Sequence, residues 1–595
     1  MVKKRNQAPA RRRSWWLPAL LAIATMAAYA NSLSGPFVFD DRGTIVDNTT
    51  IEDLGSREVL VAPRETSVAG RPAVNLSFAV NYALGGREVT GYHLVNIAIH
   101  VLCALALFGI ARRAQASDTA AFAIALIWSV HPLNTETVDY VTQRTESLMA
   151  LCYLSALYCA VRAHGAGPAR GRWQAAAIAA CALGMCSKES MVTAPIAIVL
   201  YDRAFVFGSI REAVRARGRL YAGLAATWLI LAGLMWSSPR GLSAGFSAHD
   251  ADVGTYLLNQ AVMITRYLRL ALWPRDLVLY YGWPLPLAWT AVLPEAGLIL
   301  ALLALTAFAL WRVPRLGVLG VFFFLTLAPT SSLVPIATEV GAERRMYLAL
   351  IAAVALAVVG FRWLVHAPRL RAAALAIVAV ALAAGTLARN VDYRSSLRLA
   401  ETTFERWPVP SSHSMLGTEL AAAGRLPEAE RHLREAAPVY PPARYYLGSV
   451  LAAQGQRAEA IPQFQSFIAS QPPELDQVHL ARALLADALV KEGRLDEAAA
   501  QYRAMLAGHP DDAQAMVQLA QVLLRQQRFA EASAAFRDAV AAQPDNVAAL
   551  GGLGISLASS GHVDEAIAVF RRAVDLDPQN EHAQQNLARA LALRR

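Results

Sequence analysis

Eleven apolar stretches occupy most of the first 391 residues, and each is long enough, or nearly long enough, to cross a hydrocarbon layer of about 30 Å. Runs of this kind predict membrane-spanning helices. We therefore expect an all-α fold whose first part, residues 15–391, is a polytopic bundle of about 11 transmembrane helices. The stretches lie near residues 15–33, 92–111, 119–132, 146–162, 173–188, 190–207, 219–237, 291–311, 316–332, 346–364 and 372–389.

The composition predicts at least two domains. The chain has 595 residues, 55% of them hydrophobic, which is more than one core usually holds. Residues 1–391 carry 35 Lys and Arg against 21 Asp and Glu, whereas residues 392–595 carry 20 against 24. The basic excess falls in short gaps between apolar runs and not on a soluble face with interleaved aromatic residues, which argues against nucleic-acid binding.

The gaps between the apolar stretches alternate in charge. Every second gap is basic, and these gaps together hold 21 basic residues, which the positive-inside tendency puts on the cytoplasmic side. We predict a cytoplasmic N-terminus (residues 1–14), an uncleaved first helix and a C-terminus on the outer side. The basic gaps are Lys3–Arg13, Arg112/Arg113, Arg162–Arg172, Arg203–Arg219, Arg312/Arg315 and Arg362–Arg371.

The outward gaps contain most of the polar residues. They are 34–91, 131–146, 238–290 and 333–346, and we interpret 238–290 as a long loop rich in Trp and Tyr. The cytoplasmic gaps are short and basic. We therefore expect any catalytic group on the outer face.

Two adjacent carboxylates, Asp40 and Asp41, follow the first apolar stretch in the run Gly35-Pro-Phe-Val-Phe-Asp-Asp-Arg42. An acidic side chain at the outer mouth of a helix bundle could deprotonate an acceptor, and ionisable groups in such places are functional candidates. The same pair would suit a helix-exit turn in which the aspartates cap the next element. The residues alone leave both interpretations open.

Four basic residues stand at predicted outer helix ends. Their positive charge and hydrogen-bond donors would suit a phosphate, and the alternative is ordinary snorkelling to the interface. Two of the four have an acidic residue close by in sequence, Glu146 for the first and Glu189 for the second. The four are Arg144, Lys188, Arg344 and Arg345.

A metal site is one interpretation of His131, Asn134 and Glu136, with Asp40 as a further ligand. In the alternative, His131-Pro132 caps a helix end and Glu136 pairs with a nearby arginine. We favour the second interpretation.

A repeat begins beyond Asn390. Small residues recur before the second helix of each unit, an alanine follows twelve residues later, and a proline closes the unit. The last three prolines are 34 residues apart, the tetratricopeptide period, and the small residues permit close helix crossing. We predict a linker at 392–409 and an α-solenoid at 410–595 with five repeats, a terminal helix near 581–592 and an irregular joint between repeats two and three. The positions are Gly417, Gly448, Ala486, Ala520 and Gly554; Ala429, Ala460, Ala498, Ala532 and Ala566; Pro441, Pro472, Pro510, Pro544 and Pro578.

Several motifs together resemble the transmembrane and tetratricopeptide-repeat O-mannosyltransferases, and with the repeats the resemblance covers nearly the whole chain. The motifs are Phe39-Asp40-Asp41, the run from Arg71-Pro-Ala-Val-Asn75 to Gly86, Gly91-Tyr-His-Leu-Val-Asn96, His131-Pro-Leu-Asn134-Thr-Glu136 with Arg144, Ser187-Lys188-Glu189, Tyr201-Asp202 and Glu343-Arg344-Arg345-Met-Tyr347.

The resemblance implies a membrane glycosyltransferase of the GT-C fold. Such an enzyme would transfer a monosaccharide, with mannose as the candidate sugar, from a polyprenyl phosphate to a hydroxyl of an exported protein or envelope acceptor by an inverting displacement. The first outer loop, 34–91, would supply the general base, for which we favour Asp40 over Asp41. The implied substrate-binding residues are Arg71, Asn75, His131, Glu136, Arg144, Lys188, Glu189, Glu343, Arg344 and Arg345.

The resemblance also implies that no metal cofactor is needed. The expected partners are the lipid-linked sugar, the lipid bilayer and an acceptor docked on the repeats, whose groove could hold an extended polypeptide. Short loops and high Ala and Arg usage suit a bacterial inner membrane, with the repeats on the periplasmic side. The alternatives are a non-catalytic membrane-anchored scaffold for protein–protein interaction and a transporter of lipid-linked sugars.

Overall fold

The computed structural model describes residues 15–63, 66–114, 116–237, 253–331, 335–336, 338–473 and 475–594. Over these ranges the chain is helical and contains no β-strand. It divides into two compact units, Met1–Ser412 and His413–Arg595, which are described separately. The basic residues Lys3–Arg13 and the first part of the predicted loop 238–290 lie outside the described residues.

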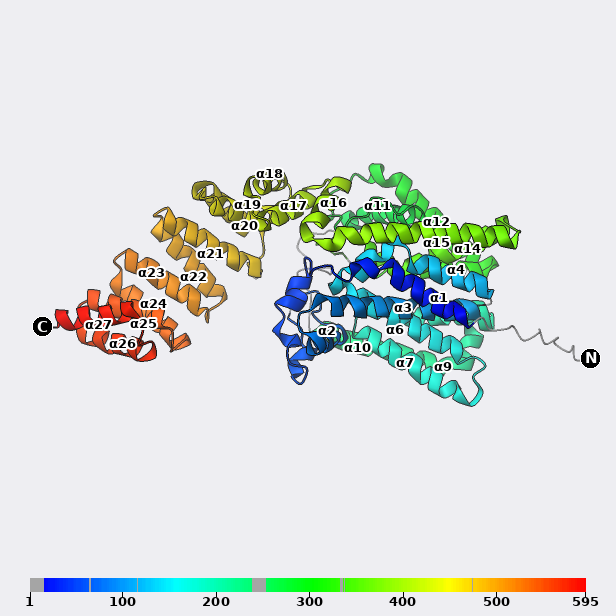
Figure 1. Ribbon diagram of the computed structural model, residues 1–595, viewed down its shortest axis with the longest axis horizontal. Helices are drawn as coiled ribbons and strands as arrows, with labels where there is room; N and C mark the ends of the chain where they lie inside the picture. The colour runs from blue at the N-terminus through cyan, green and yellow to red at the C-terminus, as the bar shows by residue number, and fades with distance from the viewer. Residues whose placement is uncertain are drawn as a thin grey trace, which may run out of the picture. The chain divides into compact units, whose positions relative to one another are not determined.

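Sixteen α-helices and several short 3-10 or π segments form the first unit (Figure 1). The helices are α1 Trp16–Ala28, α2 Pro72–Gly85, α3 Val89–Arg113, α4 Asp118–Ser129, α5 Thr135–Asp139, α6 Arg144–Arg162, α7 Arg170–Met185, α8 Ala194–Asp202, α9 Ile210–Ala226, α10 Trp228–Ser237, α11 Val253–Leu272, α12 Leu293–Arg312, α13 Pro314–Leu327, α14 Met346–Leu364, α15 Pro368–Asn390 and α16 Ser396–Arg406.

Each of the eleven predicted apolar stretches lies on one or more of these helices, so the all-α membrane fold is confirmed. Within the described residues, six helical spans are long and apolar enough to cross a membrane, and α4 and α13 are shorter apolar helices. The six spans are Val89–Arg113, Glu189–Phe207, Ile210–Ser237, Trp289–Arg312, Glu343–Leu364 and Pro368–Arg394.

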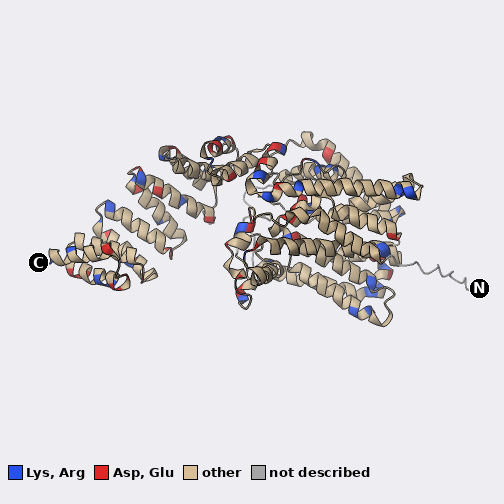
Figure 2. Cartoon of the chain, in the orientation of Figure 1, with Lys and Arg blue, Asp and Glu red and all other residues tan. Residues whose placement is uncertain are grey.

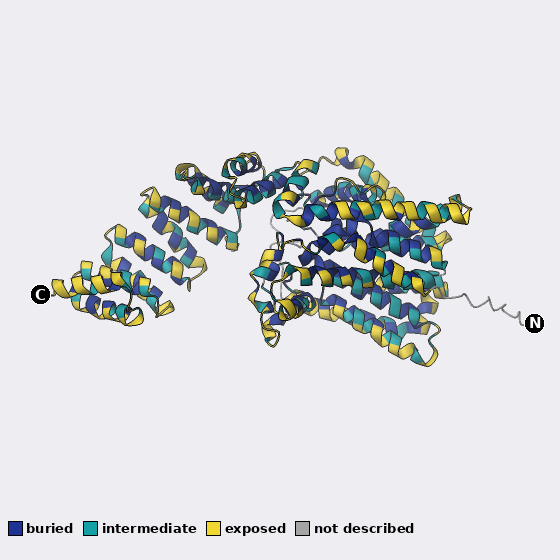
Figure 3. Cartoon of the chain, in the orientation of Figure 1, coloured by how far each residue is buried: buried dark blue, intermediate teal, exposed yellow. Residues whose placement is uncertain are grey.

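Burial distinguishes central from peripheral helices (Figure 3). About half of the apolar window of α3 and of α14 is buried, whereas α12 contains no buried residue. At the centre the Trp128 indole N–H donates to the carbonyl oxygen of Tyr347 at 2.9 Å, and both side chains are fully buried. A helix that is apolar all round yet unburied in the protein is expected to face lipid, which explains the composition of α12.

Loop contacts define two ends of the bundle. Arg362 donates to Ser117 and Arg203 donates to the carbonyl oxygen of Leu310, so gaps that were predicted to be basic meet at one end, which we call the basic end. At the other end, which we call the Asp40 end, Asp41 contacts Thr142. Figure 2 shows Lys and Arg gathered at the end of the bundle away from α2.

The interpretation of 238–290 as a loop is wrong in part, because α11 occupies Val253–Leu272. Polar residues such as Asn259 and Arg266 interrupt this segment, so it lacks the long apolar run of a membrane helix. One face nevertheless buries Tyr256, Met263 and Tyr267. Helices also occur inside two other predicted connections, α2 within 34–91 and α16 within 392–409.

The second unit consists of antiparallel helix pairs, beginning with α17, which crosses the unit boundary. Five pairs and a terminal helix match the predicted solenoid. A Cβ atom on Gly417, Gly448 or Gly554 would come within 2.4–2.8 Å of the partner helix, which explains the small residues. The helices are α17 Pro410–Ala422, α18 Leu426–Ala436, α19 Pro442–Ala453, α20 Arg457–Ser470, α21 Asp476–Lys491, α22 Leu495–Gly508, α23 Ala513–Arg525, α24 Phe529–Ala542, α25 Val547–Ser559, α26 Val563–Leu576 and α27 Glu581–Leu593.

The joint between repeats two and three differs from the others. Helix α21 has 16 residues, whereas the equivalent helices α19, α23 and α25 have 12 or 13. Ion pairs join the second helices of neighbouring repeats at Arg434–Glu459, Arg503–Glu531 and Arg537–Glu565. At the joint the equivalent arginine position holds Gln465, so this ion pair cannot form there.

Candidate active site

The two adjacent aspartates have different environments. Asp41 is fully buried, and its carboxylate accepts the backbone N–H groups of Val38 at 3.0 Å and of Thr142 at 2.6 Å. Burial raises the pKa of Asp41 to about 7, although these hydrogen bonds oppose the shift. Asp41 therefore joins the loop that follows α1 to the loop before α6.

Asp40, in contrast, is exposed. One of its carboxylate oxygens accepts the Ser67 hydroxyl at 2.9 Å, and its backbone N–H donates to the Tyr140 hydroxyl oxygen at 2.9 Å. The preceding residue, Phe39, has a φ of +45°, which is unusual for a bulky residue. The turn thus holds Asp40 at the surface and Asp41 in the interior.

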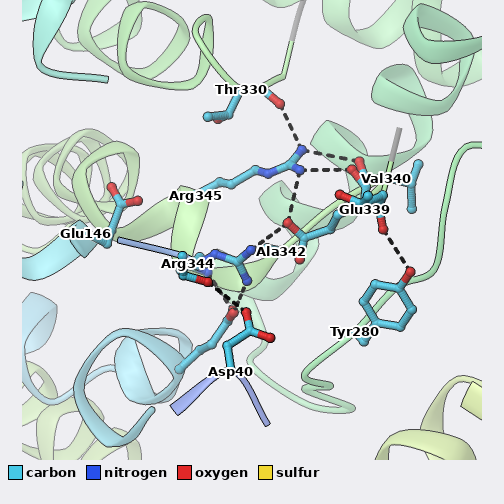
Figure 4. A network of polar contacts seen from close by, with 12 residues as sticks. Asp40, Glu146, Tyr280, Thr330, Glu339, Val340, Ala342, Arg344 and Arg345 are labelled. Carbon is cyan, nitrogen blue, oxygen red and sulfur yellow. Dashed lines mark hydrogen bonds and ion pairs between the residues drawn. The ribbon is translucent and has the colours of Figure 1, made fainter. Parts of the chain in front are cut away.

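Arg344 stands beside this turn and pairs with two carboxylates. Its guanidinium binds Glu136 and donates to Glu339 at 2.6 Å, while its backbone N–H donates to Glu136 at 2.8 Å. Glu136 is fully buried; burial raises its pKa and Arg344 opposes the shift. Figure 4 shows Asp40 close to this ion pair. The expected arginine partner of Glu136 is therefore Arg344.

Lys188 and Arg71 are two further cations that pair with carboxylates. Lys188 Nζ donates to Glu146 at 2.6 Å, and Arg71 donates to Glu189 at 2.9 Å. Burial lowers the pKa of Lys188, Glu146 opposes the shift, and the positive charges of Arg71 and Arg344 lower the pKa further. The three cations therefore lie close enough to interact electrostatically.

Ser67 connects the carboxylate to the cations. Its hydroxyl donates to Asp40, and its carbonyl oxygen accepts a hydrogen bond from Arg71 at 2.8 Å. One polar network thus runs from Asp40 through Ser67 to Arg71 and Glu189. Ser67 was not among the predicted site residues, because no motif or charge marks a serine in a loop.

Glu146 and Glu189 do not pair with the basic residues that lie beside them in the sequence. Glu146 does not pair with Arg144 but with Lys188, and Glu189 pairs with Arg71. Arg144 is fully buried and donates to the side-chain oxygens of Asn96 at 2.7 Å and Asn81 at 2.6 Å. Arg144 and Glu146 begin helix α6, in which residues two apart do not face each other, so sequence proximity did not identify their partners.

Arg345 shares the Glu339 carboxylate with Arg344, at 3.4 Å, as Figure 4 shows. Its guanidinium donates to the carbonyl oxygens of Thr330 at 2.8 Å and Glu339 at 3.0 Å. Glu343 is fully buried and accepts the N–H of Val278 at 2.6 Å. Arg345 and Glu343 therefore hold the backbone of the loops that precede α14.

Asn75 and His131 are also held by the protein. Asn75 accepts a hydrogen bond from Asn48 at 3.0 Å and donates to the carbonyl oxygen of Val59 at 2.9 Å. His131 Nδ1 accepts the N–H of Leu133 at 3.2 Å, as in the capping interpretation, and burial lowers its pKa to about 4. His131 is therefore neutral at physiological pH.

No group of three or more His, Cys, Asp or Glu side chains within the described ranges is arranged to hold a metal ion. Glu136 and His131 turn to different partners, Arg344 and the backbone of Leu133. Metal independence stays a prediction.

Two family models match the chain. Residues 70–236 match dolichyl-phosphate-mannose-protein mannosyltransferase, and residues 414–474, 445–513, 483–532 and 517–581 match tetratricopeptide repeats. In these two regions the chain is similar to the family suggested by the motifs.

Curated relatives resemble the chain over part of their length. Protein O-mannosyl-transferase Tmtc1 of Drosophila melanogaster is 31% identical over 185 residues, which are 29% of this chain and 21% of the relative. Human protein O-mannosyl-transferase TMTC4 is 30% identical over 173 residues, 24% of this chain and 23% of the relative. The matched segment thus spans about a fifth of the length of these relatives.

Two solved structures resemble the repeats. YrrB, described as a TPR protein with an unusual peptide-binding site, has 18% identity and a TM-score of 0.29, covering 31% of this chain and 96% of its own. MamA has 18% identity and a TM-score of 0.27, covering 29% of this chain and 92% of its own.

Proposed function

We propose that the chain is an integral-membrane glycosyltransferase that transfers a monosaccharide, with mannose as the candidate, from a polyprenyl phosphate to a hydroxyl of an exported protein or envelope acceptor. The observation that carries the proposal is the network at the Asp40 end. An exposed carboxylate lies in the same network as Arg71 and beside Arg344, and a third cation, Lys188, interacts with both arginines. Residues 70–236 also match a mannosyltransferase model.

The proposed reaction is a displacement at the anomeric carbon of the sugar. Asp40 takes the proton of the acceptor hydroxyl as its oxygen forms a bond to that carbon. The bond between the carbon and the phosphate oxygen breaks on the opposite side, and polyprenyl phosphate leaves with the bonding electrons. Attack from the opposite side inverts the configuration at the anomeric carbon.

Asp40 suits the base better than Asp41. Asp40 is exposed, whereas the carboxylate of Asp41 is enclosed and already accepts two backbone N–H groups. A base has to come within hydrogen-bond distance of the hydroxyl that it deprotonates. The Ser67 hydroxyl fixes one oxygen of Asp40. Asp41 supports the turn that presents its neighbour.

Arg71, Lys188 and Arg344 would stabilise the leaving phosphate. A phosphate monoester leaving group needs positive charge and donors rather than a general acid. Each cation is held by a carboxylate, Glu189, Glu146 or Glu136, so its position is fixed before substrate arrives. We assign supporting roles to the other predicted residues, namely Asn75, His131, Arg144, Glu343 and Arg345, because each is buried and binds other protein groups.

We further propose that the basic end faces the cytoplasm of a bacterial inner membrane, with the Asp40 end and the repeats outside. The alternation of basic gaps supports this orientation. The repeats would bind the acceptor polypeptide or a partner protein, as concave repeat surfaces commonly do.

The test is mass spectrometry of exported glycoproteins in a strain that lacks the gene and is complemented with variants. Wild type and Asp47→Asn, which alters an exposed aspartate in the same loop, should restore the glycans. Asp40→Asn should not, although its amount in the membrane stays the same. Unchanged glycans in the deletion strain would contradict the transferase proposal and favour the scaffold.

A further inference from the structure

The basic end carries a helical segment that exceeds the thickness of a membrane. The apolar span Ile210–Ser237 has 28 residues, which at 1.5 Å per residue extends about 42 Å, whereas a hydrocarbon core of about 30 Å requires about 20 residues. Helix α9 loses helical geometry at Arg217, where φ is −137° and ψ is 21°. The break leaves about two turns, Ile210–Arg217, outside the length needed for crossing.

A buried ion cluster fixes this break. Arg217 Nη1 donates to both carboxylate oxygens of Asp202, at 3.0 and 2.7 Å, and lies 2.6 Å from His164 Nε2. The Tyr221 hydroxyl donates to Asp202 at 2.6 Å. His164 Nε2 lies 2.9 Å from the same carboxylate. Removing one partner from a buried pair leaves a charge without compensation, so such pairs hold their geometry. Helices α6, α8 and α9 are joined at this point.

The part of α9 that precedes the break at Arg217 has two exposed stripes on its surface. Ala213 and Arg217 face the protein and are buried. Ile210 and Val214, four residues apart, are each 48% exposed, and Arg211 and Arg215, also four residues apart, are exposed beside them. At 100° per residue the apolar pair and the arginine pair lie on adjacent strips of the helix surface.

We propose that Ile210–Arg217 lies in the headgroup layer of the membrane and binds anionic phospholipid. Ile210 and Val214 contact the acyl boundary, and Arg211 and Arg215 donate to lipid phosphate oxygens. The charge at this end complements an anionic leaflet, since Arg170, Arg172 and Arg219 are exposed there too. Glu212, the acidic residue of the segment, points to the far side of the arginine strip.

The test measures lipid selectivity of the full-length chain by native mass spectrometry, with dioleoylphosphatidylglycerol competing against dioleoylphosphatidylcholine. Wild type should retain phosphatidylglycerol preferentially, and Arg211→Gln/Arg215→Gln should lower the preference at least about fivefold. The matched control, Arg571→Gln/Arg589→Gln, removes two exposed arginines of the repeats and should keep it. Equal preference in wild type and the Arg211/Arg215 variant would overturn the proposal.

Nitroxide labels test the depth of the segment in phosphatidylglycerol-containing nanodiscs. A label on Val214→Cys should collide mainly with oxygen, and one on Glu212→Cys mainly with a water-soluble nickel chelate, with Cys159 and Cys186 replaced by Ala to prevent background labelling. Equal access of the nickel chelate to both labels would overturn the membrane position. Because neither readout involves glycosyl transfer, the result does not depend on the proposed function.

Discussion

Two ion pairs at the Asp40 end, Arg344–Glu136 and Lys188–Glu146, are largely buried and join distant parts of the sequence. The ion pairs between arginine and glutamate in the repeats are more exposed and join residues of one repeat or of neighbouring repeats. Arg344 and Glu136 are 208 residues apart, and Lys188 and Glu146 are 42 apart. In the repeats, exposed arginines meet glutamates three residues later at Arg425–Glu428, Arg494–Glu497 and Arg528–Glu531.

The difference lies in desolvation. A buried ion pair has lost its hydration, so removal of one partner leaves the other without compensation. An exposed pair keeps most of its hydration and contributes little to stability. Charge at the Asp40 end therefore fixes positions, whereas charge on the repeats mainly keeps their surface soluble. Four changes, from the largest expected effect to the smallest, test this contrast.

Removing a buried carboxylate should have the largest effect. Glu146→Ala leaves Lys188, which is 90% buried, without its anion, and should lower the free energy of unfolding by about 3–5 kcal/mol. Thermal unfolding of the full chain in nanodiscs measures the loss. The matched change in the repeats, Glu428→Ala, should leave the unfolding midpoint unchanged. Similar losses from both variants would remove the distinction between the two units.

Close helix crossing, rather than charge, should control the stability of the repeats. Gly554→Ala would put a Cβ atom 2.4 Å from the Phe570 ring and should cost about 1–3 kcal/mol. In the same helix, Gly551 has open space around it, so Gly551→Ala should stabilise by about 0.5–1 kcal/mol. Hydrogen exchange of α25 and α26 in the full chain reports both changes. Protection that falls equally in both variants would contradict the packing explanation.

The Asp40 end should also lose stability as the pH rises. Burial raises the pKa of Asp139 to about 8, so between pH 4 and 8 the folded protein binds a proton that the unfolded chain has released. Stability therefore falls with rising pH in this window, by up to about 1.4 kcal/mol per pH unit. Asp139→Asn, which cannot ionise, should flatten the slope of unfolding midpoint against pH. An unchanged slope would rule out Asp139 as its source.

The smallest effect is expected at the irregular joint of the solenoid. Gln465→Arg should add the missing ion pair to Glu497 and slightly increase hydrogen-exchange protection of α20 and α22. Gln465→Glu would put two like charges together and should slightly decrease it. If both variants had the same effect, pairing between the second helices would not contribute to the joint.

The repeats could be predicted because their determinants are local and periodic. The positions of Gly417, Gly448 and Gly554 were predicted from spacing alone, and each contacts the partner helix of its own repeat. Membrane helices could likewise be predicted from apolar runs. Helix α11 could not, because it buries one face and carries Asn259 and Arg266 within the segment.

The sequence predicted which residues belong to the candidate site but not how they pair. The motifs identified Asp40, Lys188 and Arg344, but the pairing of each cation depends on residues brought together by the fold. The burial of Asp41, unlike its neighbour Asp40, involves the backbone N–H of Thr142, which lies 101 residues beyond Asp41. A contact between residues so far apart in the sequence cannot be predicted from the residues around Asp41 or around Thr142.

The most direct measurement of the central claim is sugar transfer by the purified full-length chain in liposomes, with a polyprenyl-phosphate mannose and exported protein as acceptor. Loss of a general base typically costs 10²–10⁴-fold in rate, so Asp40→Asn should transfer at least about 100-fold more slowly with an unchanged unfolding midpoint, and Asp47→Asn should match wild type. Transfer by Asp40→Asn at the wild-type rate would contradict the account.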